Sequence, residues 1–397
     1  MDTDDDIVIT AGVRTPFGKL GGALAPLSAI DLGATVIRAA IERSHVPPAR
    51  VGQVIMGTVV TAGLGQIPAR QAALAAGLPP EIPALGINKV CGSALKAVNL
   101  GALLINVGEA EIVVAGGMES MSNAPYLLEK ARFGYRMGNG ALVDAMVQDG
   151  LWSPTDDVHM GVYGSDGARE HAISREEQDR WALRSQQRYA AALAAGHFDD
   201  EIVPVDVPGA KGTITRVAAD EAPRPETTLE GLARLKPAFQ PDGTITAGNA
   251  PGVNDGAAAI VLMRRAAARA LGAPVLATWL SSGEAAMEPR HISAVPASAI
   301  QRALEKAGLR LRDMELMEIN EAFAAVPLVV SKILGLDHEK VNVDGGAVAV
   351  GHPIGASGAR VLMRLVYEMR RRGARYGVAG ICSGTAQGDA TVVRVGE

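Results

Sequence analysis

The chain has 397 residues, 48% hydrophobic and 20% charged, and at about 100–200 residues per domain this predicts two or three domains with sizeable cores. A net charge of −5 without any basic run argues against nucleic acid or an anionic membrane surface as a partner. No apolar stretch approaches the roughly 20 residues that span a bilayer, and Asp2–Asp6 are too acidic for a signal or transit peptide, so we expect a cytoplasmic protein.

Strand-like runs alternate with helical stretches over the first part of the chain. The helix that begins after Ser28 has a capping pattern in Ser28 and Asp31. The predicted elements are a strand at 7–10, a helix over 30–41, strands at 54–60 and just before 90, a helix over 92–106 and a strand at 111–115. This alternation is typical of an α/β fold with a sheet covered by helices on both faces.

The sequence becomes polar and loop-rich from about 120 to 252. One helix is predicted in this segment, between Ser174 and Gly196, with a Ser174/Glu177 capping box. Strands and helices then alternate again. They are strands at 257–263 and 275–280, a helix over 297–307, a strand at 341–343, a helix over 359–372 ended by Gly373, and strands at 376–381 and 391–395.

The second half of the chain shows the same alternation of strands and helices as the first half. A turn followed by a helix and a strand begins at Asn88 and again at Gly351, which makes a duplicated α/β half plausible. We therefore predict three units. Residues 1–121 plus 252–274 form the N-terminal half, 122–251 an inserted loop domain, and 275–397 the C-terminal half.

Two cysteines are too few for a disulfide framework or a structural zinc site. Cys91 lies between a predicted strand and a helix, where free N–H groups and the helix dipole favour a thiolate. Cys382 also follows a predicted strand, beside glycines. The alternative for each is a small buried hydrophobic residue.

Two further polar positions stand out. His352 lies among glycines in a crowded turn, and a structural histidine is the alternative. Asn320 and Glu321 follow an apolar run, and the alternative for them is an N-cap pair.

Taken together, these segments resemble the signature blocks of the thiolase family, in the same order and at similar separations. Further matches extend the resemblance over essentially the whole chain. The matching blocks are 88–97 (NKVCGSALKA), 115–122 (AGGMESMS), 159–161 (HMG), 236–239 (KPAF), 246–259 (TAGNAPGVNDGAAA), 320–325 (NEAFAA), 345–358 (GGAVAVGHPIGASG) and 382–388 (CSGTAQG).

The resemblance implies a thiolase-like fold of two similar mixed-sheet α/β halves, layered αβαβα, with an inserted loop domain. It implies coenzyme A-dependent Claisen condensation or its reversal. Cys91 would be the acylated nucleophile, and His352 would activate it. Cys382 would move the α-proton. Asn320 would position a water in one oxyanion hole, and the N–H groups of Cys91 and Gly384 would form the other.

Coenzyme A would be a substrate, and the resemblance implies no metal or redox cofactor. Arg224 would bind toward the nucleotide end, although a solvated loop charge is equally plausible there. The residues implied along the pantetheine and acyl region are Leu151, His159, Met160, Phe239, Ala247, Gly248 and Phe323. The chain departs from the common family pattern at Pro251, at 291–296, and at Ser383-Gly384-Thr385-Ala386, where a glycine run is usual.

The expected activity is that of an acyltransferase, with conversion of two acetyl-CoA to acetoacetyl-CoA and CoA preferred. A degradative 3-ketoacyl-CoA thiolase for longer chains is the alternative of the same class. A ketosynthase-like enzyme is disfavoured because it has no use for Cys382. A catalytically silent acyl-CoA-binding scaffold is also disfavoured, because all four reactive residues are present. The resemblance further implies a homodimer or homotetramer.

Overall fold

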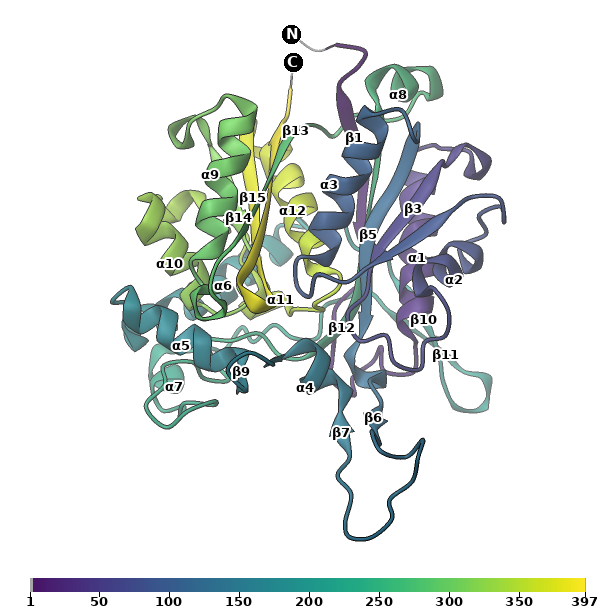
Figure 1. Cartoon of the computed structure of the whole chain (residues 1–397). Helices are drawn as coiled ribbons and strands as arrows, with labels where there is room; N and C mark the ends of the chain where they lie inside the picture. Colours follow the sequence, from purple (N-terminus) through teal and green to yellow (C-terminus); the bar gives the residue numbers. More distant parts are fainter. Residues whose placement is uncertain (1–2, 397) are drawn as a thin grey trace.

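A computed structural model describes residues 3–396 and contains one ten-stranded mixed sheet (Figure 1). The strands follow the order β14-β15-β16-β13-β1-β12-β5-β3-β4, with β2 paired to β12. They are β1 (Ile7–Arg14), β2 (Gly18–Lys19), β3 (Gln53–Gly57), β4 (Ala84–Ile87), β5 (Ile112–Ser120), β12 (Asn254–Arg264), β13 (Ala277–Ala286), β14 (Leu316–Ile319), β15 (Tyr376–Ser383) and β16 (Gln387–Arg394).

The two halves of the sheet repeat one pattern. In the first half, β3 is parallel to β5, and then β5, β12 and β1 are successively antiparallel. In the second half, β14 is parallel to β15, and then β15, β16 and β13 are successively antiparallel. The halves join where Val8 and Ile9 of β1 pair with β13. This arrangement confirms the predicted pair of similar mixed-sheet halves and adds that they share a narrow junction.

Helices form the remaining layers. The α-helices are α1 (Ala29–Arg43), α2 (Pro68–Ala75), α3 (Ser93–Asn106), α4 (Ala145–Gly150), α5 (Met160–Glu170), α6 (Arg175–Ala194), α7 (Leu229–Ala233), α8 (Arg265–Leu271), α9 (Val295–Ala307), α10 (Ala325–Leu334), α11 (Ala347–Val350) and α12 (Ser357–Arg372). Helices α3 and α12 pack on each other and on strands of both halves. Helix α1 covers the outer face of the first half and α9 that of the second. The order of layers is therefore αβαβα.

Local sequence signals account for several helix ends. Ser28 and Asp31 form the predicted capping box at the start of α1, and Ser174 and Glu177 form the one at the start of α6. Gly373 ends α12 in the left-handed conformation that glycine adopts readily. The capping predictions are confirmed.

Several predicted elements differ from the structure, among them the strands at 341–343 and 111–115. Residues 341–343 form no strand, because Asn342 has a φ of 48° and only Val341 makes a bridge, to Met317. The side chain of Asn342 instead exchanges two hydrogen bonds of 2.8 Å with the main chain of Ile319, in place of strand pairing. The predicted 111–115 strand also continues to Ser120.

The segment between β5 and β12 is richer in structure than its single predicted helix. It contains α4 to α7 and three short hairpins, β6 (Tyr126–Leu127) with β7 (Val143–Asp144), β8 (Trp152–Ser153) with β9 (Val158–His159), and β10 (Val205–Pro208) with β11 (Ile214–Val217). The β6–β7 hairpin extends away from the layers at the end of the molecule opposite the chain termini (Figure 1). The division of the chain at 121, 251 and 274 stays a prediction.

Helix α5 was not predicted because its glycines lower helix propensity. Those glycines allow close packing instead. A Cβ on Gly161 would lie 2.0 Å from the ring of Phe239, and one on Gly164 would lie 2.7 Å from Phe323. Tertiary contacts therefore stabilise this helix. Within residues 3–396, no helix is long and apolar enough to cross a membrane.

Candidate active site

A mostly apolar cavity of about 190 Å³ lies where turns from both halves of the sheet meet elements of the inserted segment. It brings together nine of the thirteen residues that the sequence analysis singled out. These are Cys91, His352, Cys382, Gly384, Leu151, His159, Met160, Phe239 and Phe323. Both sulfurs and the imidazole therefore share one cavity, although Cys91 and His352 come from separate turns and Cys382 from the end of β15.

Cys91 lies on the turn immediately before α3, whose N-cap is Gly92. The preceding residue, Val90, has a φ of 45°, a strained conformation for a β-branched residue. Burial raises the pKa of the Cys91 thiol, and the nearby Cys382 raises it further. Burial therefore acts against the thiolate that the helix start is expected to favour. Cys91 consequently needs a base to take up its proton.

The hydrogen bonds of His352 assign its tautomer. The hydroxyl of Ser357 donates to the carbonyl of Pro353 at 2.8 Å, so it accepts from Nδ1–H of His352 at 2.6 Å. The lone pair therefore lies on Nε2. Burial lowers the pKa of His352 to about 3, with a further contribution from Arg360. The imidazole is neutral near pH 7 and can accept a proton.

A glycine and an asparagine hold the His352 turn in place. Gly351 has a φ of 105°, and a Cβ there would lie 2.7 Å from the side-chain amide of Asn254. That amide oxygen accepts the N–H of His352 at 2.9 Å. The turn therefore requires glycine at 351, for its backbone conformation and for the approach of Asn254.

Asn320 follows β14 directly and is fully buried. Its Oδ1 accepts a hydrogen bond from Arg360 at 3.1 Å, which leaves its Nδ2 to face Nε2 of His352 at 3.5 Å. Arg360, a donor only, thereby fixes the orientation of the amide. Helix α10 begins five residues later with Ala324 as its N-cap, so the N-cap alternative for Asn320 is wrong.

Cys382 is 1% exposed near the end of β15. Burial raises its pKa to about 12. The following residues form a tight turn in which Thr385 and Ala386 have φ values of 57° and 51°, so the departure from a glycine run introduces strain beside the cavity. Gly384 contacts Val90, and a Cβ there would lie 3.0 Å from Cγ2 of that side chain.

Aromatic side chains from the inserted segment and the second half line the wider part of the cavity. The rings of His159 and Phe239 stack with centroids 4.1 Å apart, and Phe239 meets Phe323 edge-on at 6.3 Å. Burial lowers the pKa of His159, which therefore contributes as a neutral ring. These surfaces suit an apolar, flexible chain that carries few charges.

Four predicted residues lie outside the cavity lining. Asn320 reaches it only through His352. Arg224 is exposed and donates to the carbonyl of Ala247 at 3.1 Å, so these two residues lie together. Gly248 is buried against Leu232 and Leu235.

Five residues that hold the reactive groups were not predicted from the sequence. They are Ser357, Arg360, Asn254, Glu119 and Ser383. All except Arg360 lie in the quoted blocks, where a polar residue within a glycine-rich motif was an available signal. Arg360 lies two residues beyond its block and had no such signal.

Glu119 is fully buried and accepts three main-chain N–H groups, from Val59 and Val60 at 3.1 Å and from Gly355 at 2.9 Å. We expect Glu119→Ala to lower the free energy of unfolding by at least about 3 kcal/mol, because each orphaned buried donor costs about 1–3 kcal/mol. Urea unfolding measures this loss. Glu111→Ala is the control, because that carboxylate is half exposed in its pair with Arg50 and its removal should cost at most about 1 kcal/mol. Equal losses would contradict the prediction.

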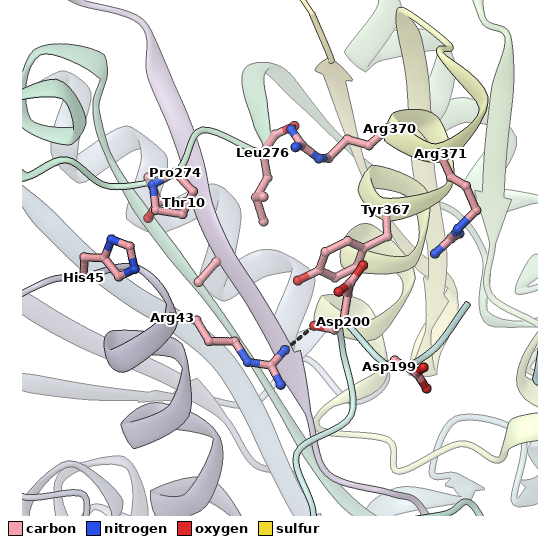
Figure 2. Close-up of a pocket in the computed structure, with 11 residues that line it drawn as sticks. Thr10, Arg43, His45, Asp199, Asp200, Pro274, Leu276, Tyr367, Arg370 and Arg371 are labelled. Carbon is pink, nitrogen blue, oxygen red and sulfur yellow. Dashed lines mark hydrogen bonds between the residues drawn. The ribbon is translucent and has the colours of Figure 1, made fainter. Parts of the chain in front are cut away.

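A larger cavity of about 720 Å³ lies elsewhere, between β1 and the carboxyl ends of α1 and α12 (Figure 2). Its arginines already bond to main-chain carbonyls. Arg43 donates to Asp200, Arg370 to Val275 at 3.0 Å, and Arg371 to His197 at 3.0 Å. None of the predicted reactive residues lines it, so volume alone does not locate the chemistry.

Comparisons with known proteins agree with this geometry. Residues 7–266 match the model of the thiolase N-terminal domain, and residues 273–395 match that of the thiolase C-terminal domain. The acetyl-CoA acetyltransferase of Pseudomonas aeruginosa is 52% identical over 383 residues, which cover 96% of this chain and 98% of that protein. The acetyl-CoA acetyltransferase of Cupriavidus necator is 52% identical over 388 residues, or 98% of this chain and 99% of that protein.

A solved structure gives the same result for the fold. The crystal structure of the Bacillus anthracis acetyl-CoA acetyltransferase superimposes with a TM-score of 0.96 at 41% identity, covering 98% of each chain. The two domain models and the relatives match nearly the full length of the chain, and the solved structure shares its fold. These findings agree with the cavity that holds two cysteines and a histidine, and this chain therefore belongs to the thiolase family.

Proposed function

We propose that the protein is an acyltransferase that catalyses the reversible condensation of two acetyl-CoA molecules to acetoacetyl-CoA and CoA through an acyl-Cys91 intermediate. The observation that carries the proposal is the pairing of two thiols with a neutral imidazole in one cavity. The names of the relatives at about 50% identity support it. Together, these groups would serve the two stages of the reaction.

The first stage transfers an acetyl group to Cys91. Nε2 of His352 accepts the thiol proton as the sulfur attacks the thioester carbonyl of acetyl-CoA, and CoA departs as a thiolate while His352 keeps the proton. The N–H groups of Cys91 and Gly384 would meet the oxyanion. One such donor is typically worth about 3–4 kcal/mol of transition-state stabilisation.

The second stage forms the carbon–carbon bond. Cys382 becomes a thiolate when its proton passes to the released CoA thiolate. It then takes an α-proton from the second acetyl-CoA, and the carbanion attacks the acetyl group on Cys91. Cys91 leaves as a thiolate and regains its proton from Nε2 of His352, while Cys382 keeps the α-proton, so both thiols and the neutral imidazole are restored. Because burial raises the pKa of Cys382 to about 12, its thiolate is a stronger base than an exposed one. A water held by Asn320 meets the enolate oxygen together with His352.

Assay of thiolysis with acetoacetyl-CoA tests this function, and a series of 3-ketoacyl-CoA substrates tests chain length. We expect the four-carbon substrate to be preferred, because Met121, Ile354 and Val59 pack together against Cys91. A higher kcat/KM for long chains would favour the degradative thiolase instead. Absence of thiolysis with every substrate would favour a non-catalytic acyl-CoA-binding scaffold.

Coenzyme A would extend past the stacked rings of His159 and Phe239, with Leu151, Met160 and Phe323 along the pantetheine and acyl region. Arg224, held by Ala247, would meet the nucleotide end near Gly248. We propose that no metal or redox cofactor is required. His197, Asp344 and Glu368 lie close enough together for an ion, but Arg364 and Arg371 already pair with Glu368.

Pro251 lines the cavity with neither a hydroxyl nor an N–H to offer. If one ordinary hydrogen bond to pantetheine is at stake, Pro251→Ser should gain about 0.5–1.5 kcal/mol. We expect the KM for CoA to fall about two- to tenfold. Steady-state thiolysis kinetics measure it, and an unchanged or higher KM would contradict the expectation.

We propose a homo-oligomer with closed symmetry, the common case among soluble proteins. The β6–β7 hairpin supports it, because Phe133 and Met137 are 93% and 97% exposed there. Light scattering at micromolar concentration should therefore give a mass of two or four chains of 41.0 kDa. A monomer would contradict the prediction. The cytoplasm remains the proposed location.

A further inference from the structure

We propose that Ser383 is a positioning residue that locks the turn of Cys91 to the turn of Cys382. Its side chain is fully buried. Its hydroxyl accepts the N–H of Gly92 at 3.1 Å and donates to the carbonyl of Lys89. The inference deepens the proposed function and rests on it, because the two turns carry the N–H groups that would form one oxyanion hole.

The two partners of the hydroxyl flank the dipeptide Val90-Cys91. One side chain from the second half of the sheet therefore ties both ends of the segment that presents the nucleophile. Ser383 also directly precedes Gly384 in the chain. Its hydrogen bonds consequently help to set the separation between the N–H of Cys91 and the N–H of Gly384.

The two turns that Ser383 links both contain strained backbone conformations. Val90 on one turn and Thr385 and Ala386 on the other have positive φ values between 45° and 57°. Such conformations persist only where the surroundings impose them. The side chain of Val90 packs over Gly384 at the same contact, so packing and the Ser383 hydroxyl act together to keep two unfavourable turns in shape.

A nearby ion pair also crosses between the halves, from Nζ of Lys89 to Oδ2 of Asp389 at 2.8 Å. It holds the end of a flexible side chain. The Ser383 hydroxyl bonds main-chain groups, and main-chain N–H groups would supply the oxyanion hole of Cys91 and Gly384. We therefore assign the positioning role to Ser383 and not to Lys89.

The test compares Ser383→Val with Ser383→Thr, which differ only in the hydroxyl and add the same methyl group. The extended backbone at 383, with φ −140° and ψ 155°, suits both β-branched residues. We expect Ser383→Val to lower kcat for acetoacetyl-CoA thiolysis at least tenfold with the KM for CoA within twofold of wild type. Ser383→Thr should stay within threefold of the wild-type kcat.

A second readout does not depend on turnover. Iodoacetamide should alkylate Cys91 several-fold faster in Ser383→Val than in Ser383→Thr, because the released turn exposes the sulfur. Ser281→Ala is the matched control, since Ser281 is also buried and donates to the main chain, at Ala303. It should lose stability and keep kcat.

Equal kcat values and equal alkylation rates in the two variants would overturn the positioning role, as would an equal loss in both. If Ser383→Val does not fold, Ser383→Ala against wild type makes the same comparison. A wild-type protein that neither cleaves acetoacetyl-CoA nor acetylates Cys91 would refute the proposed function, and the alkylation rates would still decide the role of Ser383.

Discussion

Cys382→Ala should become acetylated at Cys91 when it is given acetyl-CoA, and should still fail to condense it. The first stage needs Cys91, His352 and the oxyanion donors, whereas the second needs a base for the α-proton. General acid–base groups typically contribute about 10²–10⁴-fold, so condensation should fall by that factor. Mass spectrometry of the Cys91 peptide and a coupled condensation assay measure the two stages separately.

Exchange of the α-protons of acetyl-CoA with deuterium should also be lost in this variant, because a methyl group cannot accept a proton. Cys91→Ala is the matched control, since it should form no acyl-enzyme and could retain some exchange. Near-wild-type condensation by Cys382→Ala would show that Cys382 is structural and would reopen the ketosynthase-like alternative. A label found only away from Cys91 would refute the nucleophile assignment.

His352→Ala should slow acetylation of Cys91 by about 10²–10⁴-fold, because the thiol loses its base. The pH dependence should change as well. Burial lowers the pKa of His352 to about 3, so wild-type His352 stays an unprotonated base through the neutral range. In the wild-type protein, the rate of Cys91 acetylation should therefore show no decline, as the pH falls, with an apparent pKa near the ordinary histidine value of 6.5. In the variant the rate should rise about tenfold per pH unit, in step with the thiolate, because burial raises the pKa of Cys91.

His352 should also make the free energy of unfolding depend on pH, in the acidic range. The unfolded chain protonates this histidine below about 6.5 and the folded protein does not, so the free energy of unfolding falls as the pH drops from about 6.5 toward 3. His352→Ala should lose part of this slope, which urea unfolding across that range measures. A wild-type rate that falls below pH 6.5, with the same slope of stability in both proteins, would show that His352 titrates normally.

The sequence predicted the elements whose local signals agree with their tertiary context. Helix α1 was expected over 30–41 and spans Ala29–Arg43, because its capping box and apolar face both point to the same boundaries. The β5 strand was predicted to end at 115 because Gly116 and Gly117 disfavour strands. Their role is non-local, since a Cβ on Gly116 would lie 2.0 Å from the carbonyl of Ala258 and one on Gly117 1.8 Å from that of Gly355.

The positions of the reactive residues followed from motifs, but their electrostatics did not. A helix start at Cys91 predicted a thiolate, and only the folded cavity shows that burial reverses the direction of the pKa shift. The tautomer of His352 depends on Ser357 and Pro353, and the orientation of Asn320 depends on Arg360. Such partners are set by packing between layers, which no local pattern encodes.

Strand β12 pairs with β1 and β5 in the sheet but is synthesised after both of them. This strand, Asn254–Arg264, separates β1 from β5, both of which leave the ribosome long before it. At a synthesis rate of about 5–20 residues per second, the nascent chain waits about 7–30 s after β5 for the strand that pairs with both. During that time β1 and β5 expose unpaired edges rich in apolar residues, a hazard for aggregation. We therefore expect the nascent chain to depend on chaperones until β12 emerges.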